Sequence, residues 1–342
     1  MRDIITFGAA IQDLFLRFHA NEIGVQLQHD GTKNLVLPYG EKLVADAAHV
    51  EVGGGASNTA SAYKLLGLES AAAVAVGKDE FGGHIVNELR QRGVDGHFIV
   101  QTSEAPTGFS VLLATRDGDR TALVYRGAND FLTFDKIPHN DDLLETRWFS
   151  ISHLSGHAQG LLHEILTLKA SKPELRIAWN PGSTQIHRGI AALHNQLAQT
   201  ELLFLNREEA QQLANRRGSV EAPLVESLHQ IAAKFLAAGT KVVVITDGKH
   251  GAAAWTKTER FYAGILPTTV ANTTGAGDAF MAGFVAGYDL SHGDISTGLA
   301  YGTANAAGVV RRFGAHNGLR SAAEIRAVLA SHPAFLVRRK KY

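Results

Sequence analysis

The sequence predicts an α/β protein with a mostly parallel central sheet, helices on both faces of that sheet, and a small added β layer. In the second half, strand-like apolar runs alternate with helix-like segments, at 148–152 and 158–169, 175–179 and 190–197, and 202–205 and 207–214. Such alternation is typical of βαβ units and a parallel sheet. Residues 14–50 show only short β-like pieces and no helical pattern, which indicates a lid or functional insert.

Composition narrows the classes of protein that the chain can belong to. At 342 residues it can form one large α/β domain or two ordinary ones. Lys and Arg together number 33, as do Asp and Glu, so the basic excess of a nucleic-acid binder is absent. There is no cysteine, no apolar run long enough for a membrane span, and no apolar leader before the strand-like residues 4–7. We therefore expect a cytoplasmic protein with neither nucleic-acid nor membrane partners.

The stretch from Asn272 to Tyr288 carries the strongest chemical pattern. Phe280, Phe284 and Tyr288 recur at the spacing of one helix face. The helix would begin in a turn whose members Gly275, Ala276 and Gly277 can direct free backbone amides at an anion, and the next residue is Asp278. A carboxylate beside such a positive pocket is a candidate base for a substrate hydroxyl during phosphoryl transfer. The simpler interpretation is a glycine-rich loop with Asp278 as helix cap.

Other polar residues follow expected strands, where ligands bind in open α/β sheets. Asp13 comes soon after the strand 4–7 and could bind two sugar hydroxyls, or only cap a turn. Glu209 comes just after the strand 202–205 and could organise water around Mg²⁺, although acids are also favoured at helix starts. Two β runs, 108–115 and 121–125, flank Asp117-Gly118 and predict a hairpin. The chain contains no P-loop motif and no protein-kinase signature set.

Two distant motifs together resemble one known family. The segment 272–278 resembles the C-terminal signature of the ribokinase-like (PfkB) carbohydrate kinases, and the segment 52–58 resembles their N-terminal signature. Markers between them keep the family's order, so the resemblance spans nearly the whole chain. It implies a single ribokinase-like kinase domain over 1–342, with a lid built from about 14–50 and 105–130. It also implies phosphorylation of a sugar hydroxyl with ATP and Mg²⁺.

The resemblance assigns further roles residue by residue. Substrate-binding positions are Asp13, Gly53, Gly54 and Asn58; nucleotide-binding positions are Asn206, Thr246, Gly248, Gly251 and Asn305; Glu209 would hold Mg²⁺ through water. Asn58 could instead bond its own helix backbone. The family usually has Asp where this chain has Asn272, so we expect a monovalent cation to bind weakly or not at all. A homodimer through the lid is also implied.

Two other functions fit the same residues. One is an adenosine or nucleoside kinase of this family, because both groups share these motifs. The other is a non-catalytic sensor of sugars or nucleotides, against which the intact Asp278 and its glycine turn argue.

Overall fold

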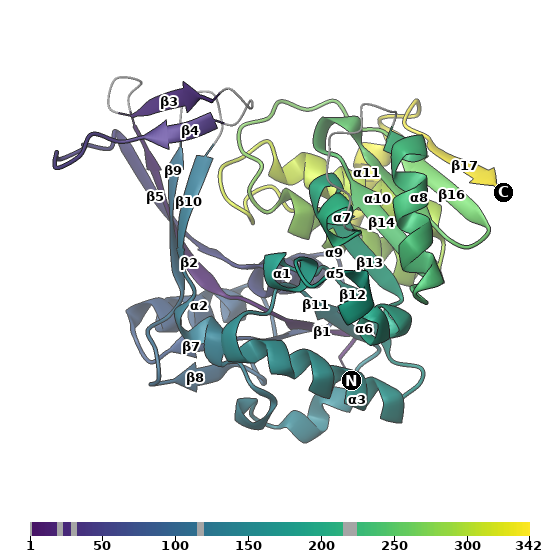
Figure 1. Cartoon of the computed structure of the whole chain (residues 1–342), viewed down its shortest axis with the longest axis horizontal. Coiled ribbons are helices and arrows are strands. Elements are labelled where there is room, and N and C mark those ends of the chain that lie inside the picture. Colours follow the sequence, from purple (N-terminus) through teal and green to yellow (C-terminus); the bar gives the residue numbers. More distant parts are fainter. Residues whose placement is uncertain (1, 19–22, 29–32, 115–119, 215–223) are drawn as a thin grey trace.

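The body of the molecule is built on one large sheet (Figure 1). The structure is a computed structural model that describes residues 2–18, 23–28, 33–114, 120–214 and 224–342. The nine strands lie in the order β17 (Val337–Lys341), β16 (Glu259–Ala263), β15 (Ala252–Trp255), β14 (Val242–Thr246), β13 (Leu202–Asn206), β12 (Arg176–Trp179), β11 (Trp148–Ile151), β1 (Ile4–Phe7) and β6 (Ser70–Ala73). Neighbours from β6 to β14 are parallel, and those from β14 to β17 are antiparallel. The mostly parallel sheet is therefore confirmed.

Helices cover both faces of this sheet, as predicted. Successive strand residues point to opposite faces, so Ile5 and Phe7 join one buried cluster and Ile4 joins another. The cluster of Ile5 includes side chains of α3 (Leu161–Ser171), α6 (His194–Gln199), α7 (Arg207–Leu213) and α8 (Leu224–Ala237). The cluster of Ile4 includes side chains of α1 (Gly55–Leu65), α9 (Ala276–Leu290), α10 (Ile295–Val309) and α11 (Ala322–Ala330).

A separate four-stranded sheet stands beside the body, and we call it the lid. Its order is β10 (Arg120–Tyr125), β9 (Phe109–Ala114), β2 (Ile11–Arg17) and β5 (Ala47–Gly53), and β9 and β10 form the predicted antiparallel pair. The turn expected at 117–118 lies outside the described residues. Figure 1 shows these strands standing together at one side of the body, with the hairpin of β3 (Gly24–Leu27) and β4 (Lys33–Val36) at their far end. Because β2 begins at Ile11, Asp13 lies inside a lid strand and not in a loop after β1.

The residues between β2 and β5 pack onto one face of the lid. Phe18 and Ile23 are buried against Leu113, together with the partly buried Leu16, Leu35, Leu43, Ala45 and Val111. The described residues of this segment thus cover apolar surface of the lid. Part of the lid remains open to solvent, since Val50 is 52% exposed and Leu123 is 56% exposed. The lid dimer stays a prediction.

Local sequence signals explain where the remaining elements begin. Asp79 caps α2 (Glu80–Gln91) by accepting from the amide of Gly82 at 2.8 Å, which satisfies one of the free donors at the helix start. The position of Ser57 before a helical pattern indicates a cap, but α1 begins earlier, after Gly54, and the Ser57 hydroxyl donates to the carbonyl of Gly53 at 2.5 Å. The short strands β7 (Ala75–Gly77) and β8 (Val100–Thr102) pair with each other, and the short helices α4 (Ser183–Ile186) and α5 (Gly189–Ala192) follow β12. No helix within the described residues combines the length and apolar composition needed to cross a bilayer.

Candidate active site at the start of helix α9

Helix α9 begins in a turn that only glycine permits. Gly275 precedes the helix with φ of 73°, a left-handed conformation, and a side chain there would overlap Ala315. Glycine adopts this conformation without steric cost. The amides of Gly275 and Gly277 have no hydrogen-bond partner within the described part of the chain, and the Ala276 amide makes a long bond to the Thr273 carbonyl at 3.3 Å. The turn therefore leaves two donors at the positive end of the helix available to an anion.

Asp278 lies in the first turn of α9, beside those amides. Its Oδ2 accepts a hydrogen bond from Nδ2 of Asn58 in α1 at 2.8 Å. Burial raises the pKa of Asp278 to about 6; the Asn58 bond opposes that rise, and the charges of Asp13 and Glu209 add to it. A carboxylate that ionises near neutral pH can both take up and release a proton under working conditions.

The predicted substrate-binding residues gather around Asp278. Asp13 is buried in β2 and accepts a hydrogen bond from the Ser110 hydroxyl of β9. A side chain at Gly53 would overlap the Asp13 carboxylate, so glycine there lets β5 and Asp13 lie close together. Gly54 has φ of 98° and turns the chain from β5 into α1, which carries Asn58. The lid sheet and α1 thus bring Asp13 and Asn58 to the same site as Asp278.

The predicted nucleotide-binding residues lie at the carboxyl ends of β13 and β14. Asn206 and Thr246 are the last residues of these neighbouring parallel strands and pair with each other in register. Asn206 caps α7 and forms a reciprocal pair with Glu209, in which the Asn206 amide donates to Oε2 of Glu209 at 2.8 Å. Such a reciprocal pair satisfies two backbone donors at a helix start. Gly248 and Gly251 have φ of 50° and 85°, and they shape the turn between β14 and β15.

Glu209 connects this edge of the sheet electrostatically to the start of α9. Burial raises its pKa, and hydrogen bonds from Asn206 and Asn180 oppose that rise. Its charge also contributes to the raised pKa of Asp278. A carboxylate held by backbone and amide donors near a helix start is a suitable outer ligand for hydrated Mg²⁺, which prefers oxygen and keeps several of its waters.

Asn305 and Asn272 are both engaged within the protein. Asn305 is completely buried, donates to the Ala279 carbonyl at 2.9 Å and accepts from the Arg320 amide at 3.0 Å. Its side chain therefore fastens α10 to α9, and its nucleotide-binding role stays a prediction. Oδ1 of Asn272 accepts from both the amide and the hydroxyl of Thr274 at 2.8 Å, while its Nδ2 is buried without a partner among the residues that the structure describes.

Two residues at the site were not among those predicted. Asn180 directly follows β12, donates to the Phe204 carbonyl at 2.9 Å and contacts Glu209. Its position after an apolar strand is the same signal that singles out Asn206. Glu51 lies opposite Asp13 in the lid, in a segment whose strand periodicity is too short to assign a face.

The body, the lid and the site together define a class of protein. An α/β body that presents free helix-start amides and a carboxylate, beneath a lid that carries a second buried carboxylate, is the architecture of a small-molecule phosphotransferase without a P-loop. Comparison with known proteins agrees. The family model described as pfkB family carbohydrate kinase matches residues 23–322, and the chain belongs to this family of phosphotransferases.

Individual relatives are distant but cover most of the chain. An uncharacterized sugar kinase from Archaeoglobus fulgidus is 29% identical over 258 residues, covering 74% of this chain and 96% of that protein. A ribokinase from Staphylococcus aureus is 26% identical, with 81% and 88% covered. The structure of Arabidopsis thaliana ribokinase complexed with ribose and ATP has a TM-score of 0.79 at 20% identity, with 96% and 98% covered, and it shows the ribokinase-like fold.

Proposed function

We propose that the chain transfers the γ-phosphoryl group of ATP to a hydroxyl of a small sugar, with Asp278 as the base. The observation that carries this proposal is the placement of Asp278 directly beside the unpartnered amides of Gly275 and Gly277, among the residues that the structure describes. Asp278 accepts the proton of the substrate hydroxyl as that oxygen attacks the phosphorus. The two amides stabilise the charge that builds up on the transferring group.

Residues of the lid and of α1 orient the acceptor. Asp13 is held by Ser110 and binds sugar hydroxyls with its remaining acceptor capacity. Oδ1 of Asn58 is buried without a partner in the described part of the chain, while Nδ2 of the same side chain is bonded to Asp278. A substrate hydroxyl that donates to Oδ1 therefore lies next to the base. This arrangement holds the reacting oxygen and the base in one geometry, which lowers the entropic part of the barrier.

The nucleotide lies across the carboxyl ends of β13 and β14. Asn206, Thr246, Gly248 and Gly251 approach it there, and Glu209 orients the water shell of Mg²⁺. Bound Mg²⁺ neutralises charge on the phosphates during transfer. Ala276 contributes less to the anion pocket than its glycine neighbours, because its amide already bonds to Thr273. Closure of the lid over the sugar keeps water from competing as acceptor.

A nucleoside kinase is the second candidate function. Phe15 and Phe313 line a cavity of about 440 Å³ between the lid and the segment after α10, large enough for a group attached to the sugar. A base in this cavity would contact aromatic side chains. Sugars and nucleosides are therefore compared directly in the test.

The test is release of ADP in a coupled assay over D-ribose, D-fructose and adenosine. Asp278→Asn should lower kcat by about 100- to 10,000-fold, because it removes general base catalysis and leaves the amides of Gly275 and Gly277 in place. Binding of ATP should change little. Asp135→Asn, an exposed carboxylate of the same type, is the matched control and should retain full activity. A near-normal rate in Asp278→Asn would show that Asp278 is not the base.

A further inference from the structure

Glu51 is a second carboxylate on the substrate-facing side of the lid. It pairs with Asp13 across β2 and β5, and residues paired in this way project from the same face of a sheet. The Asp13 carboxylate lies against Gly53, which is two residues from Glu51 in β5. Glu51 therefore faces the same side of the lid as Asp13. Its side chain is only 12% exposed.

The protein holds one oxygen of Glu51 and leaves the other without a partner. Oε1 accepts from Nδ2 of Asn317 at 2.5 Å and lies 2.5 Å from Nε2 of His49. Oε2 is buried and has no hydrogen-bond partner among the described residues. The carboxylate also lies so close to Gly314 that any side chain there would collide with it. A buried carboxylate oxygen without a donor is unfavourable, so a fixed group of this kind indicates a missing donor.

A cavity begins beside Glu51 and runs away from Asp13 along the lid. Both partners of Glu51, His49 and Asn317, line this cavity of about 440 Å³, as do Phe15 and Phe313. Side chains alternate between the two faces of β2, so Phe15, two residues after Asp13, lies on the same face as Asp13. A substrate held by Asp13 and extending along the lid would therefore pass Oε2 of Glu51 before it reaches the aromatic side chains.

The geometry points to Glu51 as a second substrate-binding carboxylate, whose Oε2 accepts a hydrogen bond from a hydroxyl of the substrate. Glu51 would select a substrate whose group next to Oε2 is uncharged. A phosphate or carboxylate in that position would be disfavoured, because two negative charges would lie in contact. This preference concerns the group in contact with Oε2, because Arg17, Arg312 and His49 line the cavity further along the lid. Arg17 is paired with Asp46 at 3.5 Å, Arg312 donates to the Asn317 carbonyl at 3.2 Å, and His49 is held by Glu51 itself.

This inference deepens the proposed function and rests on it for the identity of the site. It is tested by binding without ATP, so that an error in the assignment of the base would not affect the result. Isothermal titration calorimetry compares D-ribose, D-fructose and adenosine with D-gluconate and D-fructose 6-phosphate. The wild-type protein should bind one of the three neutral probes best. Preference for an anionic probe, or no binding of any neutral probe, would overturn the proposal.

A cycle of protein variants and substrate analogues then isolates the Glu51 contact. Glu51→Ala should weaken binding of the best neutral probe by about 10- to 100-fold, the range for a hydrogen bond to a charged group. One monodeoxy analogue of that probe should bind wild type and Glu51→Ala with equal affinity, because the interacting hydroxyl is already gone. Equal weakening of every analogue would mean that Glu51 only supports the lid, and would refute substrate contact.

Two further variants separate contact from support. Asn317→Ala removes a protein partner of Glu51 and leaves Oε2 in place, so it should weaken all analogues by a similar small factor. Glu51→Gln keeps an acceptor oxygen and should recover part of the affinity lost in Glu51→Ala. If Asn317→Ala reproduced the analogue-specific loss of Glu51→Ala, the lid contact and not the substrate would account for it.

Discussion

Asn58 and Asp278 are joined by a hydrogen bond of 2.8 Å across 220 positions of sequence. The bond links the start of α1 to the start of α9, the two helices that follow the two glycine-rich motifs. It also orients the carboxylate that we propose as the base. The other end of the Asn58 amide is buried without a partner among the described residues, so the same side chain is positioned to contact a substrate.

Asn58→Ala should change both the affinity for sugar and the ionisation of Asp278. The Asn58 bond lowers the pKa of Asp278, so its removal raises that pKa. The acid limb of the pH–rate profile should therefore move to higher pH, and KM for the sugar should rise by about tenfold for one lost hydrogen bond. Asn195→Ala, on the exposed side of α6, is the control. An unchanged acid limb would show that the bond does not tune the base.

The wild-type enzyme should lose activity below about pH 6. The proposed base works only when ionised, and burial raises the pKa of Asp278 from 3.8 to about 6. The rate under limiting sugar should therefore fall about tenfold per pH unit on the acid side of that value, as a single ionisation requires. Profiles of kcat/KM measured at constant ionic strength would check it. A rate that stays flat down to about pH 4.5 would contradict the prediction.

Asp278→Asn should stabilise the protein at neutral pH while greatly lowering kcat. Because the folded-state pKa is raised above the unfolded value, Asp278 favours folding below about pH 4, and that contribution is lost as the pH rises through about 6. At pH 7 the buried charge costs about 1–3 kcal/mol, which the neutral amide does not. Thermal unfolding should give a higher Tm than wild type at pH 7, and nearly the same Tm at pH 4. A lower Tm than wild type at pH 7 would show that the Asp278 charge stabilises the folded protein, and would contradict this prediction.

K⁺ should not activate this enzyme. A cation ligand at position 272 would have to present oxygen, but Oδ1 of Asn272 already accepts two hydrogen bonds from Thr274, and its other end is an amide donor. Initial rates in KCl and in tetramethylammonium chloride at equal ionic strength should agree. Asn272→Asp restores a negative charge and should introduce K⁺ dependence. A large K⁺-specific gain in the wild type would refute this expectation.

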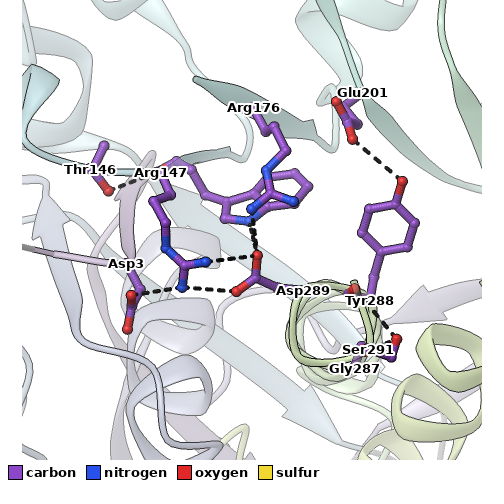
Figure 2. Close-up of polar contacts among 10 residues, drawn as sticks. Asp3, Thr146, Arg147, Arg176, Glu201, Gly287, Tyr288, Asp289 and Ser291 are labelled. Carbon is purple, nitrogen blue, oxygen red and sulfur yellow. Dashed lines mark hydrogen bonds and ion pairs between the residues drawn. The ribbon is translucent and has the colours of Figure 1, made fainter. Parts of the chain in front are cut away.

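Asp289 should be a major contributor to stability, through the opposite end of α9. Figure 2 shows its carboxylate facing Arg147 and Arg176, and the side chain of Asp289 is 3% exposed. It accepts from Arg176 at 2.5 Å and from the indole of Trp148 at 2.9 Å, while Arg147 also reaches Asp3 at 2.8 Å. Asp289→Asn leaves two arginines without their shared partner and should cost about 3 kcal/mol.

Chemical denaturation would measure that loss. Glu104→Gln, which breaks an exposed pair with Lys136, is the matched control. The control should cost only about 0.5 kcal/mol, because ion pairs open to solvent contribute little. Equal effects of the two variants would show that burial does not strengthen the Asp289 cluster.

Much of the architecture was accessible from local patterns. The strand Ile4–Phe7, the alternating strands and helices after residue 148, the lid hairpin and the helix that starts beside Gly275 all followed from apolar periodicity and turn residues. The less accurate predictions concern residues whose place depends on where a helix begins or on which strands pair. Ser57 lies inside α1, because Gly54 already turns the chain, and Asp13 lies inside the lid strand β2 and not in a loop after β1.

The sequence by itself determined the strand 4–7, the alternating strands and helices after residue 148, and that a carboxylate follows a glycine-rich helix start. These properties depend on neighbours within a few positions, where side-chain periodicity and backbone freedom act. The tertiary structure alone decided that Asn58 bonds to Asp278 and that Asn305 of α10 is buried and bonded to α9. It also decided that one oxygen of Glu51 is left without a donor among the described residues. Burial and hydrogen-bond partners arise from chain segments far apart in sequence, and no local pattern contains them.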